Sequence, residues 1–202
     1  MERPLVVAIT GASGSLYGLR LVQELLAAKK RVTLLLSRAG AEVLKHETGI
    51  DWCGAAATVE AAMRQHFGAG EELEHYSQDD FFAPVASGSS APQAVVIAPC
   101  SMGTAARVAA GLSGNLIERV ADVALKERRP LLLVPREAPL SSIHLENLLT
   151  LSRAGAQILP AMPAFYSRPQ SIDDLVAFVV GKILDSLGIE HQLFPRWGEE
   201  LP

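Results

Sequence analysis

The sequence predicts an α/β protein built on a parallel sheet. Short runs of continuous apolar residues, rich in valine, leucine and isoleucine, are typical of strands that are buried on both faces. These runs alternate with segments of helical character, and such alternation indicates right-handed β-α-β crossovers. The length of 202 residues suits one domain, so we expect a single domain over 1–202.

The expected elements follow one another with one interruption. The first strand, at 5–10, runs through a glycine-rich turn at 11–18 into a helix whose apolar residues continue to Leu26. Residues 48–92 form the irregular part, with one helix near 59–67 and a loop of small residues at its end. Further strands are expected at 31–37, 94–99, 131–135 and 157–161, and further helices at about 39–47, 101–111, 116–127, 143–154 and 173–187. The tail from about residue 189 resembles a docking segment, and we expect it to contact a neighbouring subunit.

Composition excludes several classes of function. Hydrophobic residues make up 49 % of the chain, no apolar run is long enough to cross a bilayer, and the first residues lack the pattern of a signal peptide. The net charge of −4 and the absence of a basic tract argue against a nucleic-acid partner. Two cysteines, Cys53 and Cys100, form neither a disulfide framework nor a zinc motif. We therefore expect a cytoplasmic protein without a metal and with buried subunit interfaces.

Ligands of open parallel sheets bind beyond the carboxyl ends of the strands, so the residues that follow each strand are candidates for the site. Gly11, Ala12 and Ser13 follow the first strand, and a glycine-rich turn before a helix suits a phosphate. Ser37, rather than an acid, follows the second strand, which favours a mononucleotide over a dinucleotide. The third strand leads into a hydroxyl-bearing helix start, made of Ser101, Met102, Gly103 and Thr104. Simple helix capping is the alternative for the turn after the first strand and for Ser101 after the third.

Charged residues at the same edge suggest chemistry. Arg136 could hold a phosphate through two hydrogen bonds, and Glu137 could move a proton. Glu47 ends a predicted helix, where a carboxylate is disfavoured, which favours a chemical role over a structural one. The five histidines share no spacing that suggests a catalytic triad or a metal site, and His144, at a helix start, is expected to be structural.

Six stretches together resemble the flavin prenyltransferase family, known as UbiX and formerly called phenylacrylic acid decarboxylases. They are TGASGSLYG, ASGSSAP, APCSMGT, NLIERVADVALKERRPLLLVPREAPLSSIHLENLL, PAFYSRPQSIDDLV and LFPRWGE, and they cover most of the chain. The resemblance implies a flavodoxin-like, Rossmann-type three-layer α/β/α fold in a homododecamer with active sites between subunits. It also implies transfer of the prenyl group of dimethylallyl phosphate to N5 and C6 of reduced FMN without a metal. The prenylated FMN would serve a UbiD-type decarboxylase.

The resemblance also implies roles for single residues. The catalytic residues would be Ser13, Glu47, Glu137, Lys126 and Arg119. The FMN contacts would be Gly11, Ala12, Ser13, Ser37, Ser101, Met102, Gly103, Thr104 and Arg136. Dimethylallyl phosphate would be held by Tyr166, Lys182, Lys126 and Arg119, partly across a subunit boundary. Two positions depart from the family pattern: Lys182 replaces an arginine, which keeps the charge but loses its planar fork, and Phe81 replaces a tryptophan found in some relatives.

Two other functions remain open at this point. An FMN-dependent decarboxylase of the cysteine-decarboxylase superfamily would carry an active-site histidine and a Pro-x-Met-Asn motif, and the sequence shows neither. A non-catalytic FMN carrier would not need Glu47, Glu137, Arg119, Lys126 and Tyr166 together. The sequence does not distinguish a monophosphate donor from a diphosphate donor, nor does it divide the acid and base roles between Glu47 and Glu137.

Overall fold

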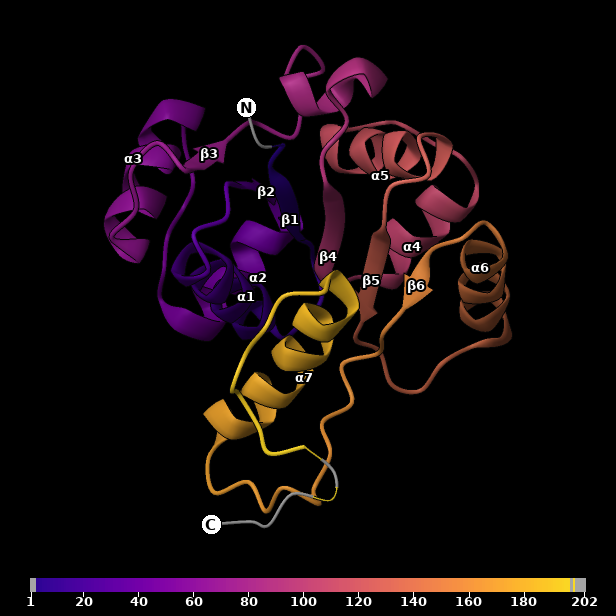
Figure 1. The fold of residues 1–202 in the computed structure, drawn as a ribbon. Helices are drawn as coiled ribbons and strands as arrows, with labels where there is room; N and C mark the ends of the chain where they lie inside the picture. Colours follow the sequence, from indigo (N-terminus) through magenta and orange to yellow (C-terminus); the bar gives the residue numbers. More distant parts are fainter. Residues whose placement is uncertain (1–2, 197, 199–202) are drawn as a thin grey trace.

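A computed structural model describes residues 3–196 and 198 of the chain. Its centre is a six-stranded sheet in the order β3-β2-β1-β4-β5-β6, in which every neighbouring pair is parallel (Figure 1). The strands are β1 (Leu5–Ile9), β2 (Val32–Leu36), β3 (Leu73–His75), β4 (Ala94–Cys100), β5 (Leu131–Pro135) and β6 (Gln157–Ile158). The predicted parallel α/β architecture is therefore confirmed.

Helices connect the strands and cover both faces of the sheet. They are α1 (Ser15–Ala27), α2 (Arg38–Thr48), α3 (Ala56–Phe67), α4 (Met102–Ala109), α5 (Leu116–Lys126), α6 (Ser142–Arg153) and α7 (Ile172–Leu187), with short 3₁₀ turns at Pro84–Ala86 and Gly88–Ser90. The expected helix positions are confirmed to within a few residues.

The core is divided between the two faces of the sheet because successive side chains of a strand point in opposite directions. In β1, Leu5, Val7 and Ile9 pack in one apolar cluster with α1, α2, α3 and α7. Val6 and Ala8 pack in the other cluster with α4, α5 and α6. Both faces are buried, which explains why the strands are continuous apolar runs and confirms a three-layer α/β/α arrangement.

Two expectations about the strands were wrong in detail. The sequence predicted five strands, but β3 adds a sixth at the edge, within the segment taken as irregular. The last strand was expected at 157–161, but β6 covers only Gln157–Ile158. Both are short strands at the two edges of the sheet, where a single neighbour supports the pairing.

The tail returns onto the helix that precedes it. The ring of Phe194 lies 4.8 Å from the ring of Phe178, and the side chain of Asp185 binds both His191 and Arg196. Gly181 permits this packing, because a Cβ at that position would lie 2.4 Å from the Phe194 ring. Residues 189–196 thus contact α7 of their own chain. Docking on a neighbouring subunit stays a prediction, and it also involves residues 197 and 199–202, which lie outside the described part.

Within the described residues, no helix is both long enough and apolar enough to cross a membrane.

Candidate active site

The strand order reverses between β1 and β4, and the candidate site lies at the carboxyl ends of these two strands. From β1 the chain continues outward to β2 and β3, whereas β4 begins the other half of the sheet. The hydroxyl of Thr10 donates to the Pro99 carbonyl at 2.8 Å and accepts from the Ser101 N–H at 2.8 Å. This side chain, which sequence reasoning missed, joins the ends of the two strands at the point where a ligand is expected.

Glycines allow two loops to touch at this edge. A Cβ on Gly11 would lie 2.6 Å from the Cβ of Ala39, and a Cβ on Gly40 would lie 2.5 Å from the Ile9 carbonyl oxygen. Backbone therefore meets backbone between the end of β1 and the start of α2. The glycine at 11 that the sequence singled out is required by this close approach.

A hollow of about 370 Å³ opens above this contact, and we call it the strand-end hollow. Four predicted site residues, Gly11, Ser37, Ser101 and Thr104, line it together. Its lining is completed by Arg38, Ala39, Gln78, Arg107 and Asn115, none of which was predicted as a site residue. Among the lining residues that the structure describes, there is no carboxylate, while hydroxyls, amides and two guanidinium groups are all present.

Two helices begin at the strand-end hollow. Ser37 caps α2 by accepting the Gly40 N–H at 2.9 Å, and Ser101 caps α4 by accepting the Thr104 N–H at 3.2 Å. The first N–H groups of a helix have no carbonyl partner within the helix, and the dipole is positive at that end. Capping and anion binding are thus compatible roles for these serines. Each serine caps one N–H group, and the remaining first N–H groups of the same helix can bind an anion.

Glu47 lies beside this region and binds the turn that opens α1. Its carboxylate accepts the Gly14 N–H at 2.9 Å and the Ser15 N–H at 2.8 Å. Burial alone would raise the pKa of Glu47, but hydrogen bonds from the Ser13 side chain and from these two N–H groups bring it below its usual value. Glu47 is therefore a carboxylate at the carboxyl end of α2 that is stabilised by the amino end of a different helix, α1.

The loop after β5 reaches the loop after β1. Arg136 Nε donates to the Ser13 carbonyl at 3.1 Å, which brings the predicted phosphate clamp next to the predicted catalytic serine. Glu137 is exposed and accepts the N–H of Ala138 at 3.1 Å. Met102 and Ala12 are buried, so they could contact a ligand chiefly through their backbones. The structure thus brings Ser13, Glu47 and Arg136 to one place, with Glu137 at its rim.

The other four predicted residues lie elsewhere in the chain. Arg119 donates from Nε to the Ala86 carbonyl at 3.1 Å and binds Asp122 at 3.0 Å. Lys126 pairs with Glu127 at the end of α5, five residues before β5 begins, and so lies at the amino ends of the strands. Within a single chain, Lys126 and the strand-end hollow therefore lie at opposite ends of the strands.

Tyr166 and Lys182 belong to a projection that extends beyond the carboxyl ends of the strands (Figure 1). We call this projection, made of residues 162–171 and α7, the arm. The Tyr166 ring packs edge-to-face on Phe178 at 5.8 Å, and Lys182 Nζ lies 3.5 Å from a carboxylate oxygen of Asp185. The arm thus carries two of the four predicted prenyl-phosphate ligands, while the buried face of α7 packs on the core.

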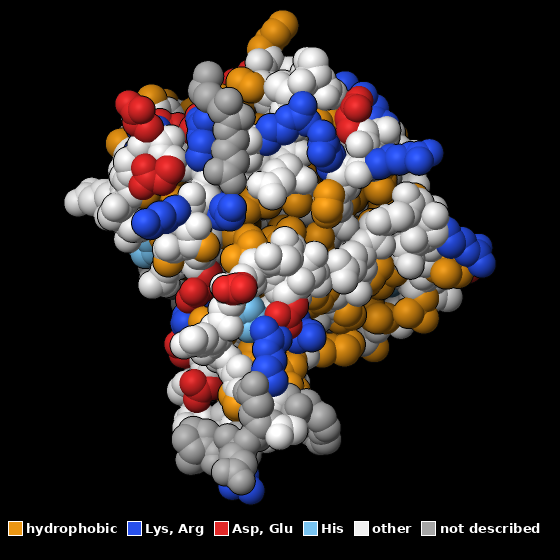
Figure 2. All heavy atoms as spheres, in the orientation of Figure 1, with side chains coloured by type: hydrophobic (Ala, Val, Ile, Leu, Met, Phe, Trp, Pro, Cys, Tyr) orange, Lys and Arg blue, Asp and Glu red, His pale blue; other side chains and the backbone are white. Residues whose placement is uncertain are grey.

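Large apolar side chains are exposed on the arm and on the body next to it. Figure 2 shows hydrophobic side chains gathered on the lower right of the body, beside the projecting part. On the arm, Phe165, Ile172 and Met162 are about 70 % exposed. Exposed apolar surfaces of this kind mark contacts with other chains or with ligands.

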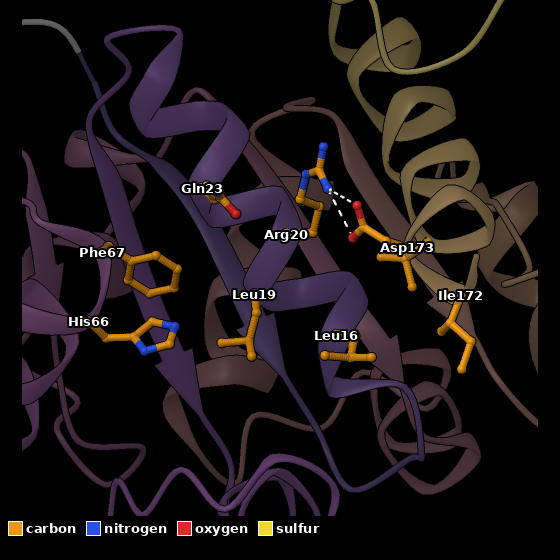
Figure 3. A pocket seen from close by; sticks show the side chains of 9 residues that line it. Leu16, Leu19, Arg20, Gln23, His66, Phe67, Ile172 and Asp173 are labelled. Atoms are coloured by element: carbon orange, nitrogen blue, oxygen red, sulfur yellow. Dashed lines mark hydrogen bonds and ion pairs between the residues drawn. The ribbon is translucent and has the colours of Figure 1, made fainter. Parts of the chain in front are cut away.

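Two further hollows open at the surface of the chain. One of about 460 Å³ lies between α1, α3 and α7, where Arg20 of α1 binds Asp173 of α7 at 2.9 Å (Figure 3). No predicted site residue lines it. The other, of about 260 Å³, adjoins the strand-end hollow and shares Ser37, Arg38 and Gln78 with it. In the described part of the chain, no group of three or more His, Cys, Asp or Glu residues could hold a metal ion.

Known proteins give this geometry its context. The Flavoprotein family matches residues 1–184. The flavin prenyltransferase UbiX of Pseudomonas aeruginosa is 53 % identical over 197 residues, which are 97 % of this chain and 94 % of that protein. The flavin prenyltransferase UbiX of Methanocaldococcus jannaschii is 46 % identical over 194 residues, which are 96 % of this chain and 98 % of that protein.

Solved structures agree with these relatives. A UbiX structure (AnUbiX, PadA1) in complex with FMN and dimethylallyl pyrophosphate has a TM-score of 0.87 at 38 % identity, and the match covers 99 % of this chain and 100 % of that one. A dodecameric FMN-dependent UbiX-like decarboxylase from Escherichia coli O157:H7 has a TM-score of 0.86 at 40 % identity, covering 97 % and 100 %. The predicted flavodoxin-like fold is confirmed, and the chain belongs to the flavin prenyltransferase (UbiX) family of flavoproteins.

Proposed function

We propose that this chain is a flavin prenyltransferase that joins the five-carbon group of dimethylallyl phosphate to N5 and C6 of reduced FMN and releases phosphate. The observation that carries the proposal is the strand-end hollow, with two helix amino ends and two arginines, next to Ser13 and Arg136. It occurs in a chain that is 53 % identical to a flavin prenyltransferase over nearly its full length. We further propose that the product serves a UbiD-type decarboxylase.

The residues present fit FMN. The lining of the strand-end hollow offers hydroxyl, amide, guanidinium and helix N–H donors, which suit a phosphate dianion. Ser37, Ser101 and Thr104 would hold that phosphate, and Arg136 would extend along the flavin from the neighbouring loop. When bound, FMN supplies the nucleophilic nitrogen and carbon that accept the prenyl group.

The transfer sets clear tasks for the protein. Joining the prenyl group to N5 breaks the allylic C–O bond, leaves its electron pair on the phosphate and releases the N5 proton, which the phosphate can accept. Closing the ring at C6 removes a proton from that carbon and adds one to the prenyl double bond. Cations and a hydroxyl donor at the leaving phosphate would stabilise its growing charge, and we assign this part to the cations Lys126, Arg119 and Lys182 and to the hydroxyl of Tyr166. Glu137, exposed at the rim beside Arg136, would move a proton.

We infer that complete sites form only between chains. Lys126 and Arg119 lie with the loop before β4, while Tyr166 and Lys182 lie on the arm, so one chain leaves the strand-end hollow without its expected prenyl-phosphate ligands. The exposed apolar residues of the arm suit burial against another copy. The dodecameric relative supports a homo-oligomer of the same order here. Cytoplasmic localisation remains a prediction from the composition.

An anaerobic assay tests the proposal. The purified protein is loaded with FMN, reduced with dithionite and mixed with dimethylallyl phosphate, and the flavin is then analysed by mass spectrometry. We expect a gain of one C5H8 unit with release of phosphate, and the diphosphate donor is run in parallel to decide which donor is used. An unchanged flavin mass with both donors, while FMN stays bound, would overturn the prenyltransferase and favour a carrier or a decarboxylase.

A further inference from the structure

A buried carboxylate lies beside the strand-end hollow. Glu118, in the first turn of α5, is only 1 % exposed. Its carboxylate accepts the Gly114 N–H at 2.8 Å, the Asn115 side-chain amide at 2.7 Å and a hydrogen bond from Arg107 Nε. A carboxylate removed from water must be hydrogen-bonded and paired with a cation, so Arg107 is its charge partner.

The guanidinium of Arg107 is folded back over the start of its own helix. Arg107 belongs to the last turn of α4, yet its Nη1 lies 3.5 Å from the position that a Cβ on Gly103 would take. It lines the strand-end hollow together with Ser101 and Thr104, which open α4. Nε is held by Glu118, and among the described residues no partner of the terminal nitrogens is seen. These nitrogens are the donors that remain for a ligand.

A cation in this position is unfavourable unless an anion accompanies it. The amino end of a helix carries a partial positive charge, and both α2 and α4 begin at the strand-end hollow. Arg38 lines this hollow and also the adjoining one, where Glu42 and Asp79 lie. Glu118 offsets the charge of Arg107 but not the positive ends of the two helices, so an excess of positive charge faces the hollow. A group with two negative charges, such as a phosphate monoester, would balance it.

We propose that Arg107 is a further ligand of the flavin phosphate in this protein and that Glu118 is the positioning residue that directs it. The inference rests on the proposed function, because it takes the phosphate of FMN as the occupant of the strand-end hollow. Arg107 contacts the ligand, whereas Glu118 acts only through Arg107 and through the loop at Gly114 and Asn115.

Riboflavin provides the test because it is FMN without the phosphate. Affinities for oxidised FMN and riboflavin are measured by flavin fluorescence for the wild type, R107Q/E118Q, R107K and E118Q. The double variant removes both charges together and so avoids leaving a buried carboxylate unpaired. R153Q is the matched control, since Arg153 is an exposed arginine at the end of α6 that does not line the hollow. Thermal melts confirm that each variant is folded.

We expect R107Q/E118Q to bind FMN about ten- to a hundredfold more weakly, which is the usual effect of a hydrogen bond to a charged group. Riboflavin affinity should stay unchanged, and the dependence of FMN affinity on salt should become shallower. R107K should keep part of the preference for FMN, E118Q should show a smaller loss, and R153Q should match the wild type. If the double variant does not fold, R107K and E118Q still separate loss of FMN affinity from loss of riboflavin affinity.

Equal weakening of FMN and riboflavin binding, or no change in either, would overturn the role of Arg107. In that event a wild-type preference for FMN over riboflavin would still support the proposed function. Wild-type protein that binds the two flavins equally well would instead show that the strand-end hollow does not hold the phosphate, and the proposed cofactor site would fail with it.

Discussion

The carboxylate of Glu47, at the next-to-last position of α2, accepts a hydrogen bond of 2.9 Å from the N–H of Gly14. The two residues are 33 positions apart, and their contact places a negative charge at the amino end of α1. Gly14 has a φ of 110°, in the region that favours glycine, and it caps α1 without a side chain of its own. Glu47 therefore supplies the cap that the glycine cannot, and it holds the turn next to Ser13.

Replacement of Glu47 by Gln should lower the free energy of unfolding by about 1 kcal/mol, because a neutral amide caps the helix more weakly. The pKa of Glu47 is held below its usual value, where the hydrogen bonds from Ser13, Ser15 and Gly14 outweigh the opposing effect of burial. This stabilisation is complete above the unfolded-state pKa and is lost as the pH falls through the lower folded-state pKa. Thermal melts of the wild type and E47Q should therefore converge as the pH falls below the ordinary glutamate pKa of about 4.3. A constant difference between the two melts would contradict this role.

Replacement of Glu137 by Gln should leave flavin bound but slow turnover by about a hundredfold or more, because the residue is assigned to proton transfer. Its side chain is exposed, and the hydrogen bond with Ala138 is the only one it makes to residues that the structure describes, so the fold should be unaffected. Flavin affinity and the anaerobic prenylation rate are measured on the same preparation. Wild-type turnover in E137Q would remove Glu137 from the mechanism.

Replacement of Arg136 by Ala should weaken FMN binding by about tenfold or more, since a charged hydrogen-bond donor is lost at the site. The variant also breaks the link from Arg136 Nε to the Ser13 carbonyl, which joins two loops at the strand ends. Titration with FMN compares R136A with R136K, which keeps the charge but not the planar fork. An unchanged affinity in R136A would show that this arginine is not a flavin ligand.

Chains that carry either K126A or E137Q should complement each other. Each variant alone should be nearly inactive, but co-expressed chains can form sites that take Lys126 from one subunit and Glu137 from another. Random mixing would leave about a quarter of such shared sites intact, with a corresponding return of activity. If both residues served a site within one chain, no intact site could form. Co-expressed variants that stay inactive would therefore contradict the shared site.

The parts of the fold that could be predicted are those whose sequence pattern is set by burial. β4 is buried at all seven positions, so its apolar run is unambiguous. β3 has only three residues, of which Glu74 is half-buried, and a run that short carries no recognisable period. β6 has two residues and one neighbour, although Leu159 and Ala161 still donate to the carbonyls of Leu133 and Pro135 in β5, at 2.8 and 3.0 Å. Edge strands depend on their partners more than on their own residues.

The site could be predicted where it follows a strand and not elsewhere. Gly11, Ser37 and Ser101 each follow a strand directly, so the parallel sheet alone brings them together. Gln78 lies in the irregular segment, and no local pattern places it at the strand-end hollow. Arg107 lies one turn beyond the recognised motif, and only the path of its side chain back over α4 brings it to the site. Such residues depend on tertiary contacts that the sequence does not display.

The strand-end hollow is lined in part by closely packed backbone, which we call its floor, and in part by side chains, which we call its walls. This difference limits how the protein can evolve. At Gly11 and Gly40 any side chain would collide with Ala39 or with the Ile9 carbonyl, so a change there would damage fold and ligand binding at once. The walls, at Gln78, Arg107 and Asn115, come from separate elements, so a change at one of them alters the lining without forcing two stretches of backbone apart. New ligand preferences in this lineage are therefore expected to arise through wall residues, while the two glycines stay fixed.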